Sequence, residues 1–385
     1  MTIDLDRAVE VFAASRDRTV GLEEEFAVLD PQTLDMAPRF EHLRDTAEIE
    51  DPALHAQITG ELISSEIEII SGAGDDIHDA IARQRDARRR LFAHVARHGA
   101  ALGATGTHPW ADYREQPNID TEHYRRVVDG LGYVARRNNT FSLHVHVGVQ
   151  DLDRAVRVCD RLRPVLPLLL AVSANSVYVD GIFSNLHTTR TETFTKVFPR
   201  CGVPDAYGSW DAYRDYLELL IRTGSIVEYT QVWWSVRPHF SYGTVEVRIC
   251  DVQSTAAESE ALSKLIVACV AQAVRDEDDG LPPNDLPHRL IEENMWRAIR
   301  HGLDGSMLDF VAGSEYPSAE IVPRLAAWTA PVRAEMGIEL TNPAETGGNG
   351  AQRQWRAHAG GADLRSVYAD VVQETARTYG MEVPA

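Results

Sequence analysis

The sequence predicts an α+β fold, in which helices cover one face of a largely antiparallel sheet. Segments with strand patterns are spread through the first 250 residues, whereas helical patterns dominate residues 255–385. Hydrophobic residues make up 44% of the 385 residues, which is enough for a sizeable core. No linker or internal repeat is visible, so we expect a single domain over residues 1–385.

Three strands and one long helix are predicted in the first third. Residues 20–29 and 61–70 have strand patterns, and each ends at a turn sequence that contains proline or glycine. Residues 75–98 predict an amphipathic helix, because apolar residues recur along one stripe and arginines cover the outer side. Residues 101–105 predict a further short strand.

The middle of the chain predicts a strand, a helix and a long irregular segment. Residues 140–149 form the strand, and Asp151 is expected to cap a helix that runs to Leu170. Pro164 lies inside this helix and should disturb it. Residues 180–210 are rich in Gly, Pro, Thr and Asn, which is typical of an irregular segment that carries a binding site.

The last third is predicted to be helical after one more pair of strands. Residues 231–238 and 244–252 are expected to pair across a short turn. A strongly helical region then begins at Ser254 or Thr255 and ends near Asp276. Further helices are expected near residues 286–303, 318–336 and 362–379.

Composition excludes several function classes. The formal net charge is −20 and the pI is near 5.1, so a basic footprint for nucleic acid or for a membrane surface is missing. Neither of the two lysines, Lys196 and Lys264, lies in a P-loop, and no strand is followed by a Gly-x-Gly-x-x-Gly motif. The longest apolar run, residues 164–174, is too short to cross a bilayer.

The cysteine pattern and the N-terminus predict a cytoplasmic protein. The four cysteines are far apart and include no Cys-x-x-Cys pair, so we expect free thiols in a reducing compartment. The acidic, amphipathic N-terminal segment does not have the pattern of a signal peptide. A homo-oligomer is compatible with the sequence, which does not show a surface for it.

Four predicted strands each carry two ionisable residues at positions i and i+2. The pairs are Glu23 and Glu25, Glu66 and Glu68, His144 and His146, and Glu246 and Arg248. Residues two apart on a strand point to the same face, so one sheet would gather all of these side chains. Such a face is costly unless it holds cations, and carboxylate oxygens are preferred ligands of Mg²⁺. A solvated sheet face would explain any one pair alone.

This constellation suits Mg²⁺–ATP, and it leaves two other functions open. Glu246 and Arg248 would place a metal ligand beside an arginine that binds phosphate, although a surface ion pair would look the same. His144 and His146 could instead begin the zinc, iron or manganese site of a metal-dependent hydrolase. A third alternative is a non-catalytic protein that binds a nucleotide on the same sheet.

Six motifs occur in order between about residues 19 and 355. They are Gly21-Leu22-Glu23-Glu24-Glu25-Phe26, Gly106-Thr107-His108-Pro109, the strand from Leu143 to Val149, Arg237-Pro238-His239 with the strand from Gly243 to Val252, the segment from Glu293 to Leu303, and Gly348-Asn349-Gly350-Ala351-Gln352-Arg353. In this order they resemble the type 2 glutamate–cysteine ligase family, whose members are often called carboxylate–amine ligases.

The resemblance implies a curved antiparallel sheet like that of glutamine synthetase, with ATP and metal ions on its concave face. It also implies an ATP-dependent carbon–nitrogen ligase that forms an amide through an acyl phosphate and releases ADP. Mg²⁺ is the expected ion, with Mn²⁺ as the alternative. Glutamate and cysteine, giving γ-glutamylcysteine, are the first substrates to expect. Residues 61–72 and 136–142 differ from the common family pattern, so another small carboxylic acid and amine, from specialised metabolism, is the alternative pair.

The resemblance also assigns roles to individual residues. It implies metal ligands at Glu23, Glu25, Glu61, Glu68, His144 and Glu246, and nucleotide contacts from His144, His146 and Arg248. It implies that Arg190, Arg248 and Glu246 act in catalysis, with Arg190 binding the carboxylate substrate and Arg248 facing the γ-phosphate. Glu61 and Glu68, seven residues apart, fit the family's acidic pair better than Glu66 does, so the roles of Glu66 and His146 stay open.

Overall fold

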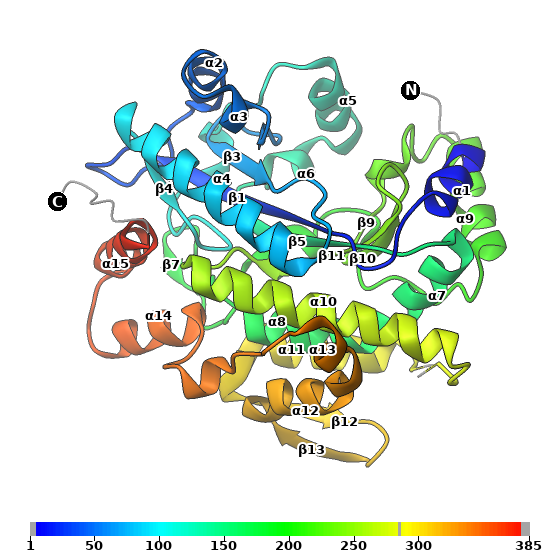
Figure 1. The fold of residues 1–385 in the computed structure, drawn as a ribbon. Coiled ribbons are helices and arrows are strands. Elements are labelled where there is room, and N and C mark those ends of the chain that lie inside the picture. The colour runs from blue at the N-terminus through cyan, green and yellow to red at the C-terminus, as the bar shows by residue number, and fades with distance from the viewer. Residues whose placement is uncertain (1–4, 284–285, 379–385) are drawn as a thin grey trace.

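A seven-stranded sheet forms the centre of the computed structural model, which describes residues 5–283 and 286–378 (Figure 1). The strand order is β10-β11-β5-β1-β3-β2, and β4 pairs with the end of β1. Every pair of neighbouring strands in this sheet is antiparallel. The strands are β1 (Val20–Leu29), β2 (Ile58–Thr59), β3 (Glu66–Ile70), β4 (Ala101–Gly103), β5 (Ser142–Gly148), β10 (Val236–His239) and β11 (Thr244–Asp251).

Four helices cover one face of this sheet, which confirms the predicted α+β class. They are α4 (Ile77–Arg97), α7 (Leu152–Leu162), α8 (Leu166–Ser173) and α10 (Ala256–Asp278). Leu22, Val145 and Val247 point to this face and join the main hydrophobic core with residues of these helices. We call it the helix-covered face, and the opposite face of the same strands the polar face.

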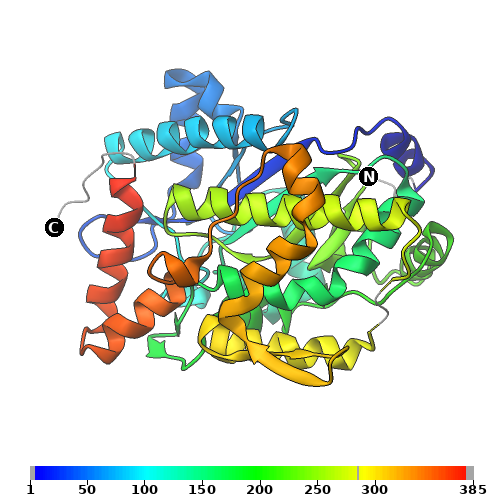
Figure 2. The same cartoon turned by 60° about the horizontal axis from the view of Figure 1, so that its bottom comes forward.

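The remaining helices surround this centre. Those of the last third are α11 (His288–His301), α12 (Ile321–Trp328), α13 (Ala330–Met336), α14 (Gly350–Ala359) and α15 (Leu364–Arg377). Figure 2 shows these helices around α10: α13 packs on α10, α11 packs on α8, and α15 packs on β4. The others are α1 (Leu5–Ala13), α2 (Phe40–Glu50), α3 (Pro52–His55), α5 (Glu122–Leu131), α6 (Tyr133–Arg136) and α9 (Trp210–Arg222). No described helix is long and apolar enough to cross a bilayer.

Short strand pairs complete the fold within the described ranges. They are β6 (Tyr178–Val179) with β7 (Ile182–Phe183), β8 (Cys201–Gly202) with β9 (Trp233–Trp234), and β12 (Ser306–Asp309) with β13 (Ser314–Pro317). The first two pairs draw strands from residues 180–210, which also contain a π-helical turn at Thr191–Thr195. The irregular segment therefore contains more hydrogen-bonded structure than its composition predicts.

The structure also corrects some predicted boundaries. The strand predicted over residues 61–70 begins only at Glu66, so Glu61 lies in the connection before it. The predicted helix from Asp151 breaks at Arg163–Val165, where Pro164 removes a backbone donor. A single helix over residues 318–336 is wrong, because it divides into α12 and α13. Residue 379, the predicted end of the last helix, lies outside the described residues.

Glu24 lies on the helix-covered face between Glu23 and Glu25, and its carboxylate is fully buried there. Arg88 of α4 donates to its Oε1 at 2.7 Å, and Gln84 Nε2 donates to its Oε2 at 2.9 Å. Ser259 Oγ of α10 donates to Oε1 at 2.7 Å. A buried charge is tolerated only when it is paired and hydrogen-bonded, so this cluster ties both helices to the central strand.

We expect Arg88→Met to lower the free energy of unfolding by about 3–5 kcal/mol, because it leaves the Glu24 carboxylate buried without its cation. Adding Glu24→Gln to Arg88→Met should recover part of the loss. Urea unfolding measures both. Arg85→Met, which removes an exposed ion pair with Glu260, is the control and should cost about 0–1 kcal/mol. Equal losses in the two single variants would contradict the role of the buried pair.

Candidate active site

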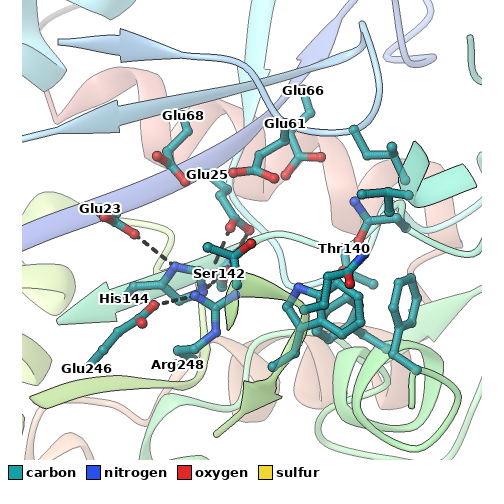
Figure 3. A pocket seen from close by; sticks show the side chains of 18 of the residues that line it. Glu23, Glu25, Glu61, Glu66, Glu68, Thr140, Ser142, His144, Glu246 and Arg248 are labelled. Carbon is teal, nitrogen blue, oxygen red and sulfur yellow. Dashed lines mark hydrogen bonds and ion pairs between the residues drawn. The ribbon is translucent and has the colours of Figure 1, made fainter. Parts of the chain in front are cut away.

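A pocket of about 260 Å³ opens on the polar face of the sheet. Figure 3 shows carboxylates from β1, β3 and the preceding connection pointing toward His144 and Arg248. All but one of the residues predicted for the site line this pocket: Glu23, Glu25, Glu61, Glu68, His144, Arg190, Glu246 and Arg248. His146 instead lines a neighbouring cavity, which also contacts Glu23. The strand pattern and the family resemblance together therefore named residues that line one pocket.

The strand register explains why these side chains meet. Glu25 of β1 lies directly opposite Glu68 of β3, and Glu23 lies opposite His144 of β5. His146 lies opposite Glu246 of β11. Directly opposite residues of antiparallel strands share a face and have closely spaced side chains. Four strands therefore bring their ionisable pairs into adjoining rows.

Glu246 forms the basic side of the pocket together with two arginines. Its carboxylate accepts hydrogen bonds from Arg237 Nε at 2.7 Å and from Arg248 Nη1. Burial alone would raise the pKa of Glu246, but the charges of Arg237 and Arg248 hold it well below its usual value. Glu246 is therefore a carboxylate at neutral pH, even though its side chain is 1% exposed.

His144 is held by hydrogen bonds on both ring nitrogens. Its Nδ1 lies 3.1 Å from Glu23 Oε2, and its Nε2 lies 2.7 Å from Ser142 Oγ. The Ser142 backbone N–H donates to Glu25 Oε2 at 2.6 Å, and the single hydrogen of Ser142 Oγ can be donated either to the same oxygen, at 2.6 Å, or to Nε2 of a neutral His144. Burial and the nearby Arg248 lower the pKa of His144, so its imidazole is neutral at pH 7 and can bind a metal ion.

Glu23 lies between the two histidines of β5. Burial raises its pKa, but His146 and His144 together lower it well below the usual value. His146 Nε2 lies 3.1 Å from Glu23 Oε1, and its Nδ1 lies 2.9 Å from Thr244 Oγ1. Although burial lowers the pKa of His146, the charges of Glu23 and Glu246 raise it overall. His146 therefore lies between the carboxylates of Glu23 and Glu246, beside the pocket.

The opposite side of the pocket has an excess of carboxylates. Burial and the charge of Glu25 raise the pKa of Glu61 to about 8. Burial and neighbouring carboxylates also raise the pKa values of Glu66 and Glu68 well above the usual range. These three groups repel one another when ionised, and a cation between them would remove that cost.

The donor atoms present fit divalent cations. Three groups of side chains bring their ligand atoms within 4.8 Å of one another: Glu25 with Glu61 and Glu68, Glu23 with Glu68 and His144, and Glu23 with His146 and Glu246. Carboxylate oxygens suit Mg²⁺ and Mn²⁺, and the imidazoles add nitrogen donors. Glu66 belongs to none of these groups, and its Oε2 has no hydrogen-bond partner among the described residues.

Arg190 has a contact that the sequence did not predict. The register between β11 and β5 shifts between Val247 and Cys250, which marks a β-bulge. Arg190 donates from Nη1 to the carbonyl oxygen of Ile249 at 3.2 Å and from Nη2 to that of Arg248 at 3.4 Å. The guanidinium thus satisfies carbonyls of the bulge, while its Nε has no hydrogen-bond partner among the described residues.

Arg237 is a site residue that received no role from the sequence. It lies directly opposite Glu246, since β10 and β11 pair across a short turn. The predicted hairpin over residues 231–252 could have shown this pairing. Once His239 pairs with Thr244 next to the turn, the register places Arg237 opposite Glu246. Tyr124 of α5 also lines the pocket, and α5 itself was not predicted.

Comparison with known proteins identifies the family. The family model described as glutamate–cysteine ligase family 2 matches residues 19–369. This chain belongs to glutamate–cysteine ligase family 2. The resemblance predicted from the motifs is therefore confirmed, and with it an ATP-dependent carbon–nitrogen ligase. The metal-dependent hydrolase is not favoured.

Curated relatives cover most of the chain. A "Putative glutamate--cysteine ligase 2" of Solibacter usitatus is 36% identical over 374 residues, which cover 95% of each chain. A "Putative glutamate--cysteine ligase 2-2" of Rubrobacter xylanophilus is 40% identical over 313 residues, covering 81% of this chain and 80% of the relative.

Two solved structures have the same fold at 12% identity, each with a TM-score of 0.68. One is the glutamate–cysteine ligase of Francisella tularensis in complex with AMP; the match covers 96% of this chain and 91% of that one. The other is a bifunctional glutathione synthetase of Pasteurella multocida. The match covers 97% of this family 2 chain but 54% of that chain, so this protein spans about half its length.

The pKa of Glu61 predicts a pH-dependent stability for the metal-free ligase. The folded chain keeps a proton on Glu61 up to about pH 8, whereas the unfolded chain releases it near its ordinary pKa of 4.5. The folded state then binds more protons in this window, so stability should fall as the pH rises from about 4.5 to about 8. Melting temperatures in EDTA across this range measure the effect.

Adding Mg²⁺ should reduce this fall, because binding displaces the protons. Below pH 8, its apparent affinity should rise by up to about tenfold per pH unit for each proton displaced. Glu61→Gln is the control, and its melting temperature should depend less on pH than that of the wild type. Identical pH profiles for the two proteins would show that Glu61 is ionised in the folded state.

Proposed function

We propose that this ligase joins a small carboxylic acid to an amine through an acyl phosphate, with ATP as the phosphoryl donor. One observation carries the proposal. Three overlapping groups of metal-ligating side chains lie in or beside one pocket, and Arg248 enters the same pocket from the bulge of β11. Carboxylates for cations beside an arginine for phosphate are the parts that phosphoryl transfer requires.

The metal ions would be held by the carboxylates and His144. The proposed ligands are Glu23, Glu25, Glu61, Glu68, His144 and Glu246, with Mg²⁺ as the ion and Mn²⁺ as its substitute. Bound Mg²⁺ supplies positive charge that offsets the phosphates of ATP. Glu246 has a second role, because its contacts with Arg237 and Arg248 hold both guanidinium groups in place.

The phosphates would lie between His144 and Arg248, and the rest of the nucleotide would extend past His146. The cavity beside His146 has a volume of about 370 Å³. Val20, Ile70 and Tyr242 contribute apolar surface to it, and Gly21 and Gly72 leave room for a flat ring. A purine base has apolar faces, so this cavity suits it better than the acidic pocket does.

The two substrates would meet at the other end of the pocket. We assign the acid to Arg190, whose buried Nε lacks a hydrogen-bond partner in the described structure. The substrate carboxylate attacks the γ-phosphorus, and the bond to the bridging oxygen breaks to release ADP. The amine, after losing a proton, then attacks the acyl carbon and displaces phosphate. Water must be kept out, since it would hydrolyse the acyl phosphate.

The choice of substrates would depend on two segments that differ from the common family pattern. Glu61, Leu62 and Glu66 come from the first segment and line the pocket. Asn138, Thr140 and Ser142 come from the second segment and line it as well. Glutamate with cysteine is the first pair to test, and another acid and amine is the alternative. The four unpaired cysteines agree with a reducing, cytoplasmic compartment.

Nucleotide analysis tests this function. The protein is incubated with Mg²⁺–ATP and a panel of acids and amines that begins with glutamate and cysteine. ADP and phosphate should appear only when both co-substrates are present. AMP with pyrophosphate would refute the acyl-phosphate route, and ATP binding without turnover for every pair would indicate a non-catalytic homologue.

Glu246→Gln is the inactive control for this assay. The carboxylate would no longer offset the charges of Arg237 and Arg248, so we expect turnover to be abolished. Because Glu246 is fully buried between the two arginines, the melting temperature of the variant should also fall somewhat. Full activity in this variant would remove Glu246 from the site.

A pair of arginine variants separates the two substrate positions. We expect Arg190→Met to raise the KM for the acid about tenfold to a hundredfold, because a charge-assisted hydrogen bond is lost, with a smaller effect on the KM for ATP. Arg248→Met should instead lower kcat and weaken ATP. Steady-state kinetics measure both variants after their melting temperatures have been compared. An effect of Arg190→Met confined to ATP would move Arg190 out of the acid site.

A further inference from the structure

A second group of metal-ligating side chains lies outside the active-site pocket, between α2 and α4. Figure 1 shows these two helices beside each other. His94 in the last turn of α4 and His98, the C-cap residue of that helix, are four residues apart, and their rings lie 4.5 Å from each other. Glu50 is the last residue of α2, and its carboxylate faces both rings. The three ligand atoms lie within 4.8 Å of one another.

Hydrogen bonding orients His94 as a metal ligand would be oriented. Its Nε2 lies 3.0 Å from the carbonyl oxygen of Leu43, and because a carbonyl only accepts, Nε2 must carry the hydrogen. The other nitrogen, Nδ1, then presents a lone pair toward Glu50. A ligating histidine commonly donates its other ring N–H to a backbone carbonyl in this way. Burial lowers the pKa of His94, which keeps the ring neutral.

Two of the three donor-atom spacings are close to those around a tetrahedral ion. Bonds of about 2.0–2.1 Å place neighbouring ligand atoms of tetrahedral zinc roughly 3.4 Å apart. Glu50 Oε2 lies 3.6 Å from His94 Nδ1, and it accepts a hydrogen bond from His98 Nε2 at 3.2 Å, where a bound ion would take the place of the hydrogen. His42 of α2 lies on the same side, with its ring 5.3 Å from that of His98, so water or His42 could complete the coordination.

The surrounding charge also favours a cation. Both α2 and α4 end here, and the C-terminal end of a helix carries partial negative charge. Arg97 already approaches the same atoms, at 3.4 Å from His94 Nδ1 and 3.7 Å from Glu50 Oε2. Its side chain is 56% exposed, so it can turn into solvent and leave these atoms to a metal ion.

We propose that Glu50, His94 and His98 bind a divalent transition-metal ion of the zinc class, which ties the end of α2 to the end of α4. Two imidazoles and one carboxylate suit Zn²⁺ better than Mg²⁺, which prefers oxygen ligands alone. The role of this site is structural, because it lies outside the active-site pocket and its ligands come from α2 and the end of α4, which do not line that pocket. Helix α4 also carries Arg88 and Gln84, which bind Glu24 of β1. An ion at the end of α4 would therefore help to hold this helix against the sheet.

Zn²⁺ binding to variants of the whole protein tests the proposal. Equilibrium dialysis is carried out with excess Mg²⁺, and bound zinc is counted by elemental analysis. The active-site groups also contain histidine, so the comparison is between proteins. The wild type should bind one more Zn²⁺ per chain than His98→Ala, and low micromolar Zn²⁺ should raise its melting temperature more.

Three further variants sharpen the result. Glu50→Gln should weaken the extra site by about tenfold to a hundredfold, as the loss of a ligating group does. Arg97→Ala should keep the site and bind Zn²⁺ more tightly, because it removes a competing cation. His55→Ala changes a nearby histidine outside the cluster and should behave as the wild type. Equal zinc stoichiometry and equal thermal response in the wild type and in His98→Ala would overturn the proposal.

Discussion

The pairing of β1 with β3 and β5 is the constraint on which both faces of the molecule depend. Three consecutive glutamates occupy β1, and the two-residue period of a strand sends Glu23 and Glu25 to one face and Glu24 to the other. On the polar face they meet carboxylates and imidazoles, whereas Glu24 meets Arg88. A shift by one residue would exchange these partners and place two unpaired carboxylates against the helices, so the register is strongly specified.

The two sides of the pocket solve the problem of buried charge differently. Glu246 is neutralised by arginines from its own strand and from β10, and its pKa is low. Glu61 and Glu68 have no such partner among their hydrogen bonds and ion pairs in the described structure, and burial with like charges raises their pKa values. The polypeptide therefore neutralises the side around Glu246 by itself, whereas cations bound on the acidic side would neutralise it and would release its protons.

The sequence predicted the sheet and the pocket well because both follow from a local period. Strand alternation alone placed Glu23, Glu25, His144 and Glu246 on one face. Glu61 was assigned correctly to the pocket but wrongly to a strand, since the turn before β3 has no strand partner in the described sheet. Helices such as α5 were missed because short helices are stabilised by tertiary packing more than by their own sequence.

Arg190 shows what sequence patterns cannot supply. Arg190 lies in a segment without a regular pattern, so only the family resemblance assigned it a role. In the structure its guanidinium donates hydrogen bonds to the carbonyl oxygens of Arg248 and Ile249 at the bulge of β11. A bulge turns the side chains of the bulged strand, so this contact helps to direct Arg248 into the pocket. An acid bound at Arg190 would then lie against the same guanidinium that fixes Arg248. Binding of the substrate and orientation of the phosphate contact would share one side chain, which couples the first step of the reaction to correct occupation of the acid site.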